Sequence, residues 1–258
     1  MNSRGRTCKI FFLLAAFWLF YLAADAATYY SRQSGAWNSR FTWSTSGHTG
    51  GAAPAFPVAG DIVYIADDNV TITSNAFCTN LIFTSGYTSG ILTVNAGISL
   101  TVSGGVTIQS AARSNTSFGI SGNGQVLCSA LTAGSDINPT SNRTTQLTVE
   151  INSLNISGGV LIYSNYRSWS GTGNNSSLFI NSGSVTVGGS VTTDNEGNPN
   201  NSTLILGNGS PALILGSTTP FTIDGTGSSA ITLNGTGATV DYNRSGAQNV
   251  FNTAYTNI

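Results

Sequence analysis

Carboxylates are the first residues to consider for catalysis, because hydrolysis of a sugar linkage needs two carboxyl groups about 5–9 Å apart. Asp67 and Asp68 are the one adjacent pair of acids, in the stretch "IADDNVTIT". Neighbours in a strand point to opposite faces of a sheet, so this pair does not suit the reaction. Asp is common in turns, and we expect the pair to form the turn before a strand that begins at Val70.

One alternative to a non-catalytic protein is an enzyme that degrades polysaccharides, a lyase or a glycoside hydrolase. It would be supported if the fold brought separate acids, such as Asp136, Glu150 and Asp241, into one cleft. A lyase would also need acids that bind Ca²⁺ and an Arg or Lys base. No lysine follows Lys9 and the acids are scattered, so we expect no catalytic residues and no cofactor.

Metal-binding residue types are sparse. His48 is the only histidine, in "STSGHTGG", and no cysteine is near it in the sequence. The stretch "TTDNEGNPNNST" places the oxygen ligands of Asp194 and Glu196 in one loop, which makes them weak candidates for Ca²⁺. This stretch lacks the spacing of an EF-hand or of a Ca²⁺-binding repeat, so a solvated turn is favoured and no metal site is expected.

Four residues in "IYSNYRSWSGTGNN" are candidates for contact with a glycan: Tyr163, Tyr166, Arg167 and Trp169. Aromatic side chains in a polar loop can stack on the faces of sugar rings, and an exposed Trp is uncommon. The alternative is that Tyr163 and Trp169 fold back over the wall of the protein as a lid.

The N-terminus predicts export. Basic residues in "MNSRGRTCK" precede an apolar run from Ile10 to Ala24, and Ala24-Asp25-Ala26 is a small-x-small cleavage pattern. This arrangement is typical of a signal peptide, here residues 1–27, with cleavage after Ala26 or Ala27. An uncleaved anchor is the alternative. We expect a protein that is secreted or displayed on the outer cell surface.

The charge of the remaining chain limits its partners. Residues 28–258 contain six arginines, no lysine and nine acids, a formal net charge of −3. Without a basic stripe a nucleic-acid partner is not expected. Hydrophobic residues make up 40% of the sequence, which is enough to build a core.

A short repeat dominates residues 61–258. Two apolar residues flank one polar residue, usually Thr, as in Leu92-Thr93-Val94, Leu100-Thr101-Val102 and Val106-Thr107-Ile108. This period of two predicts strands of three to five residues with one apolar face. Gly, Asn or Ser follows nearly every unit and supplies turns.

The close spacing of these units predicts an all-β fold, a right-handed parallel β-helix with repeats of about 20–25 residues. A β-sandwich is the alternative, but it needs longer strands and hairpin loops. A solenoid must close its ends, since an open end exposes both core and strand edge. Residues 28–60 lack the repeat and are rich in aromatics, so we expect an N-terminal cap built by Trp37, Phe41 and Trp43.

Cys78 and Cys128 follow the leader, which holds Cys8, and in an exported protein they could pair. Bridged Cα atoms lie within about 7 Å, whereas stacked strands are roughly 4.8 Å apart. A disulfide therefore requires the two residues to lie in adjacent layers. Two buried free thiols are the alternative.

The segment "GAWNSRFTWSTSGHTGGAAPAFPVAGDIVYIADDNVTIT" resembles the opening of secreted bacterial β-helix surface proteins. Their pattern of G-x-W, T-W-S, a Gly/Pro-rich loop and G-D-x-V-x-I is matched by Gly35, Trp37, Thr42 to Ser44, Pro57 and Gly60 to Ile65. Many such proteins resemble cargo of the type IX secretion system with adhesin-like roles. Those relatives are usually longer and end in a sorting domain, so the resemblance also implies that this chain is a fragment truncated at its C-terminus.

Together these features predict a non-catalytic, secreted or cell-surface β-helix with a structural or adhesive function, whose loops are candidates for glycan contact. An ice-binding β-solenoid is a further alternative, because stacked Thr residues can order water. That interpretation requires two flat, aligned columns of Thr, whereas most units carry one outward Thr. Thr is also simply a good exposed β residue.

Overall fold

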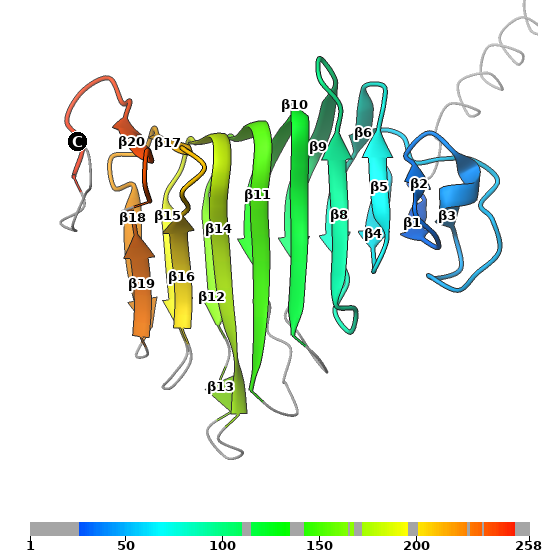
Figure 1. Ribbon diagram of the computed structural model, residues 1–258, viewed down its shortest axis with the longest axis horizontal. Coiled ribbons are helices and arrows are strands. Elements are labelled where there is room, and N and C mark those ends of the chain that lie inside the picture. The colour runs from blue at the N-terminus through cyan, green and yellow to red at the C-terminus, as the bar shows by residue number, and fades with distance from the viewer. Residues whose placement is uncertain are drawn as a thin grey trace, which may run out of the picture.

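The computed structural model describes residues 26–109, 115–134, 142–164, 166–167, 172–195, 201–225, 228–233 and 235–250. These residues are almost entirely β-strand, with one short 3-10 helix, η1 (Arg40–Thr42). The strands lie side by side along the long axis of the molecule (Figure 1). Because nearly all of them pair in parallel with a strand one coil further along the chain, the fold is a parallel β-solenoid and not a β-sandwich.

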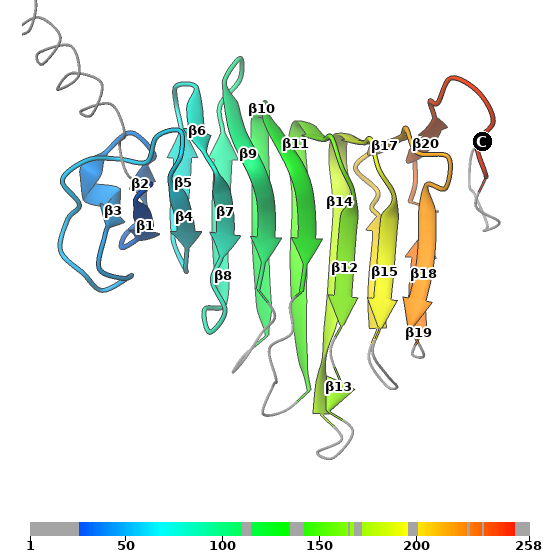
Figure 2. The same cartoon turned by 180° about the vertical axis from the view of Figure 1, so that it is seen from behind.

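Three stacks of strands form the wall of the rod. Figure 1 and Figure 2 show these strands from opposite sides of the molecule. Face A consists of β1 (Thr28–Ser31), β4 (Ile62–Ile65), β7 (Asn80–Phe83), the ends of β9 (Ser99–Ile108) and β10 (Thr116–Ala133), β12 (Val160–Ser164), β15 (Val191–Asn195) and β18 (Phe221–Gly225). Face B consists of β2 (Gly35–Ala36), β5 (Asn69–Ile72), β8 (Ser89–Val94), the starts of β10, β11 (Arg143–Ile156) and β14 (Thr172–Val187), β16 (Asn201–Leu206) and β19 (Ser228–Thr232). Face C consists of β6 (Ala76–Cys78), the start of β9, the middle of β10, the ends of β11 and β14, β17 (Ala212–Leu215) and β20 (Thr239–Tyr242).

Two short strands lie outside these stacks. Strand β3 (Trp43–Ser44) pairs antiparallel with β1 in the N-terminal region, and β13 (Tyr166–Arg167) pairs antiparallel with the start of β14.

The core is a set of aliphatic ladders that run through the coils. On face A, one such ladder joins Val63, Leu81, Val106, Leu131 and Val160, all in register and all buried. Alternation along each strand sends the residues between them outward, as the repeat predicted. Each fully buried aliphatic side chain stabilises the fold by about 1.5–3 kcal/mol relative to exposure, so the interior ladders hold the rod together.

Several strands are longer than the sequence units predicted. Strand β10 has 18 residues and β14 has 16, because both continue from one face around a corner to the next. In β10 the corner falls at Gly122, where the backbone adopts a φ of 108° and the register with β11 shifts. The repeat matches the expected 20–25 residues in the early coils, such as the 22 between Val70 and Leu92, and exceeds it in later coils. Hydrogen bonds between neighbouring coils join residues 25 positions apart near Gly104 but 31 positions apart near Asn181.

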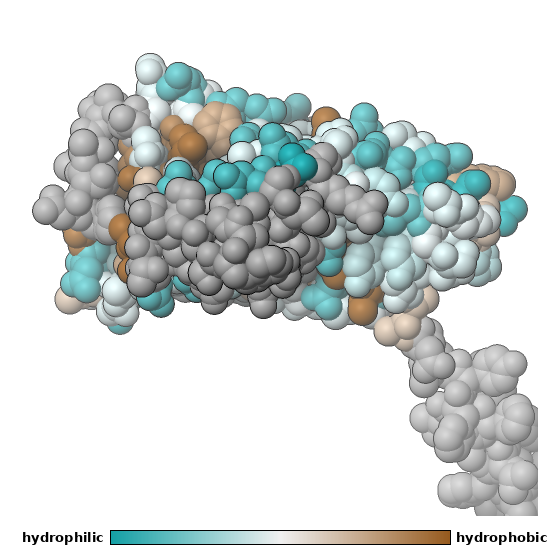
Figure 3. Space-filling view, turned by 90° about the horizontal axis from the view of Figure 1, so that it is seen from below, coloured by the Kyte–Doolittle hydropathy of each residue, from teal (hydrophilic) through white to brown (hydrophobic). Residues whose placement is uncertain are grey.

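Apolar residues reach the surface towards the C-terminal end of the rod (Figure 3). Ile223 of β18 is 50% exposed, whereas Thr193, its neighbour one coil earlier, is fully buried. No helix within the described residues combines the length and the hydropathy needed to cross a membrane.

Candidate functional site

The N-terminal closure is centred on the two tryptophans. Trp37 and Trp43 are buried with their rings edge to face, at a centroid distance of 5.1 Å. The Trp43 Nε1 group donates to the Trp37 backbone oxygen at 2.7 Å, and Trp37 Nε1 donates to the Pro57 backbone oxygen at 3.1 Å. Both indole hydrogens are therefore used within the protein, and neither ring presents a face to a ligand.

Phe41 differs from the expectation that it belongs to the buried cap. Its side chain is 53% exposed, and the Arg40 guanidinium lies 4.4 Å from the centre of its ring. Phe41 sits in η1, a tight turn that directs Thr42 inward instead. The Thr42 hydroxyl donates to the Ala36 backbone oxygen at 2.8 Å.

Asp61 organises the entry into the first complete coil. Its carboxylate is buried and accepts two backbone hydrogen bonds, from Ala27 at Oδ1 (2.9 Å) and from Val58 at Oδ2 (2.8 Å). Gly60 precedes it with a φ of 99°, a conformation that favours glycine. The G-D pair of the sequence pattern is thus a structural element that fastens the start of the chain to β4.

His48 joins the N-terminal loop to the wall. Nδ1 is 2.6 Å from the Ser31 backbone oxygen, and Nε2 is 3.1 Å from the Thr84 hydroxyl. A carbonyl oxygen only accepts, so Nδ1 carries the hydrogen. With both ring nitrogens occupied and Tyr30 and Tyr87 packed against the ring, His48 has a structural role.

Asp67 forms the turn that the sequence predicted. Its Oδ1 accepts hydrogen bonds from the backbone of Thr88 and of Ser89, at 2.6 and 2.8 Å, and from the Thr88 hydroxyl. These bonds link the corner after β4 to the equivalent corner one coil later. Within the described residues no donor is seen for the side chain of Asp68.

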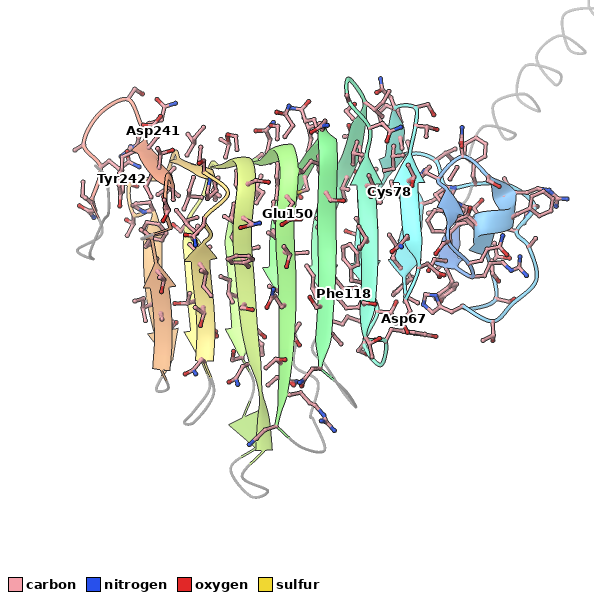
Figure 4. The ribbon with its side chains drawn as sticks, viewed as in Figure 1. Asp67, Cys78, Phe118, Glu150, Asp241 and Tyr242 are labelled. Atoms are coloured by element: carbon pink, nitrogen blue, oxygen red, sulfur yellow. The ribbon has the colours of Figure 1, made fainter. Side chains whose placement is uncertain are left out.

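The acids proposed for an enzyme do not converge. Glu150 lies on face B in β11 and accepts from Asn181 Nδ2 at 2.6 Å, while Asp241 lies on face C in β20 (Figure 4). Asp136 is outside the described residues. No group of three or more His, Cys, Asp or Glu side chains in the described part of the chain is placed to hold a metal ion.

One pair of acids was missed by sequence reasoning. Asp194 and Asp224 are register neighbours on face A, and Tyr163 is in register with Asp194 on the preceding strand. This pair could have been found from the sequence, because Asp recurs three residues after Val191 and after Phe221, which begin equivalent strands. The Ca²⁺ candidate Asp194 is thus a strand residue, and its suggested partner Glu196 lies outside the described residues.

Three of the four glycan candidates belong to the described segments where faces A and B meet. Tyr163 is a half-buried residue of β12, and Tyr166 and Arg167 form β13, whose backbone pairs with Gly173 and Thr172. Strand β13 extends beyond the row of strands at the lower edge of the rod (Figure 1). Trp169 is outside the described residues.

Cys78 and Cys128 are free and buried, so the disulfide that the sequence left open is not formed. Both pair with Val102, from opposite sides, and therefore lie two layers apart. Burial raises the pKa of each thiol to about 12, assisted at Cys78 by the negative charge of Asp61 and opposed at Cys128 by a hydrogen bond from the Ala130 backbone. Neither thiol is suited to nucleophilic chemistry.

A trough of about 410 Å³ follows face C of the described wall. Four outward residues line it, one from each of four successive coils, in register: Thr101, Leu127, Asn155 and Thr186. No charged side chain lines the trough, which we call the C-face trough. Successive coils lie roughly 4.8 Å apart, so the trough presents a hydroxyl, an aliphatic, an amide and a second hydroxyl side chain one after another along its length.

Glycines create one edge of the C-face trough. The chain turns from face C to face A at Ser103-Gly104-Gly105, at Ser157-Gly158-Gly159 and at Gly188-Gly189-Ser190. A Cβ on Gly158 would lie 2.5 Å from the Ser129 backbone oxygen, and one on Gly188 would lie 2.4 Å from that of Ser157. The coils can approach this closely only without side chains. The Gly-Gly pair that recurs beside a serine, once inside β9 and twice shortly before a strand, is the sequence signal that could have located this edge.

Outward Thr residues do not form paired columns. On face A, Thr107 and Thr132 are neighbours, but Leu161 interrupts the column before Thr192. On face C, Leu127 and Asn155 separate Thr101 from Thr186. The flat double array that ice binding requires is not present in the described parts of either face.

Comparison of the chain with protein-family models, with curated proteins and with solved structures gave no match. The geometry itself therefore defines the class: a parallel β-solenoid closed at its N-terminal end by buried tryptophans, with an uncharged trough on one face.

Proposed function

We propose that this chain is an exported structural or adhesive module without catalytic activity, whose uncharged C-face trough contacts glycans. The observation that supports this most is the C-face trough, in which hydroxyl, amide and aliphatic groups alternate along four coils. Neutral polymers offer hydroxyl groups and apolar ring faces, which such a surface can match without charge. The separation of Glu150 from Asp241 gives the enzyme alternative no support.

Rigidity is the second part of the proposal. Every strand of a β-solenoid is hydrogen-bonded to its neighbours along the axis, so the rod resists bending and can hold a contact surface away from a cell. Low charge is compatible with this role because outward Ser, Thr and Asn residues supply the solvation. The leader at residues 1–27 supports export, and the β13 region with Tyr166, Arg167 and Trp169 supplies a second candidate contact surface.

A glycan array probed with the fluorescently labelled chain from Ala27 onward tests the proposal. Two variants distinguish the surfaces: Leu127→Ser with Asn155→Ala in the C-face trough, and Tyr166→Ala with Trp169→Ala at the β13 region. Thr148→Ala, an outward change on face B, is the matched control and should bind as the unmodified chain does. Loss of binding in one double variant assigns the contact surface. No binding by the unmodified chain to any glycan would contradict the adhesive function and leave a purely structural one.

A further inference from the structure

We infer that cleavage after Ala26 creates an ion pair between the new α-ammonium group of Ala27 and the buried carboxylate of Asp61. This rests on the export proposed above. In the structure the Ala27 backbone nitrogen already donates to Asp61 Oδ1 at 2.9 Å. Hydrolysis of the Ala26–Ala27 bond by a processing peptidase adds one water, leaves a carboxylate on Ala26 and turns that nitrogen into an ammonium group in the same place.

The position of Ala27 separates the two cleavage sites that the sequence left open. Ala26 is exposed, so the bond that precedes Ala27 is accessible, whereas Ala27 is half-buried and packs against the core. Its backbone oxygen also accepts from Ile62 at 2.9 Å. Cleavage after Ala26 keeps both of these contacts, and cleavage after Ala27 would remove both.

The surroundings of Asp61 favour a charged partner. Asp61 is 4% exposed, and the second oxygen of its carboxylate accepts a hydrogen bond from the neutral backbone N–H group of Val58. A buried carboxylate is costly unless it is paired. The negative charge of Asp61 contributes to raising the pKa of Tyr29 and of Cys78, the two titratable side chains that respond to it from neighbouring strands. Both are neutral at pH 7, and within the described part of the chain the hydrogen bonds to the Asp61 carboxylate come from the backbone of Ala27 and Val58, so the ammonium group would bring a positive charge to this site.

The sequence makes this inference unusually easy to test, because Lys9 is the only lysine. In the chain that begins at Ala27, the α-amino group is the only primary amine. Acetylation therefore removes one charge at one atom and mimics the uncleaved amide. Reductive dimethylation keeps the charge at the same atom and serves as the matched control.

The experiment compares thermal unfolding of three forms of the chain beginning at Ala27, with its amine free, dimethylated or acetylated, in the original sequence and in Asp61→Asn. The free and dimethylated forms should unfold about 2–4 °C above the acetylated form, and Asp61→Asn should remove this difference. Equal transitions for all three forms, or an unchanged difference in Asp61→Asn, would overturn the inference.

Two further measurements do not depend on the folding of the variant. A ¹³C-dimethyl label gives one NMR resonance, and its titration should show a pKa above the ordinary value of about 7.7–8.0 for an α-amino group. A pKa at or below that value would contradict the ion pair. Mass spectrometry of the exported protein should give Ala27 as its first residue, and Thr28 would overturn the assigned cleavage site. A protein that is not exported fails the proposed function, while the unfolding comparison still tests the ion pair.

Discussion

Trp43 lies fully buried against Trp37 and donates its indole hydrogen to the Trp37 backbone oxygen at 2.7 Å. The two residues close the N-terminal end of the solenoid, where an open coil would expose its core. Burial and hydrogen bonding act on the same side chain, so its removal leaves both a cavity and an unpaired backbone oxygen.

Trp43→Ala should therefore lower the free energy of unfolding by about 3–5 kcal/mol, measured by urea denaturation. Phe41→Ala is the control two residues away. Phe41 is mostly exposed and contacts Arg40, so its loss should cost no more than about 1 kcal/mol. Similar losses from both variants would show that the closure does not depend on the buried pair.

The pattern of apolar and polar residues was sufficient to predict the wall. Leu100 and Val102 are buried and Thr101 between them points outward, as the period of two requires. The register between coils could not be predicted in the same way. The number of residues between the strands of face A and face B differs from coil to coil, three between β4 and β5 but five between β7 and β8, so the sequence distance between neighbours on successive coils is not constant.

The features that depend on register were accordingly the ones missed. Asp194 and Asp224 are far apart in sequence and adjacent on face A only because β15 and β18 occupy the same position in successive coils. The C-face trough likewise depends on the alignment of four coils. By contrast, the turn at Asp67 was predicted from residue type alone, whereas the hydrogen bonds that Asp67 accepts from Thr88 and Ser89, one coil later, were not.

Asp67→Ala should reduce stability by about 1–2 kcal/mol, because the backbone groups of Thr88 and Ser89 lose their acceptor. Asp68→Ala is a matched control with the same change in charge. It should change the free energy of unfolding by less than about 0.5 kcal/mol in the same urea titration. A larger effect for Asp68 than for Asp67 would contradict the observed turn.

Because both thiols are buried, we expect the free energy of unfolding to fall at high pH. Their pKa in the folded chain is about 12, above the ordinary value of 9.0, so the unfolded chain releases these protons first. The stability that the two protonated thiols contribute is fully present below pH 9, and it is lost as the pH rises from about 9 towards 12. Urea denaturation at pH 7, 9 and 10 should show a decline that is smaller in the Cys78→Ala, Cys128→Ala double variant.

The same burial predicts slow thiol labelling. In the chain that begins at Ala27, a chromogenic disulfide reagent at pH 8 should leave both cysteines unmodified while the protein is folded, and should modify both after denaturation. Rapid labelling of the native protein would contradict the burial of Cys78 and Cys128 in the core.

Two glycines of the wall should respond to alanine in opposite ways. Gly183 has a φ of 79°, and a Cβ there would lie 1.7 Å from the Ile151 backbone oxygen, which cannot move without breaking the pairing of β11 with β14. Gly119 is in extended backbone on face B, and its Cβ would meet the Ile91 side chain at 3.6 Å, an ordinary contact.

Gly183→Ala should cost at least about 2 kcal/mol, since left-handed strain and a backbone clash combine. Gly119→Ala should be neutral or stabilising by about 0.4–1 kcal/mol, because alanine restricts the unfolded chain without straining the folded one. Thermal and urea unfolding of the two variants measure this difference, and a Gly119→Ala protein as unstable as Gly183→Ala would contradict the stacking of β8 on β10.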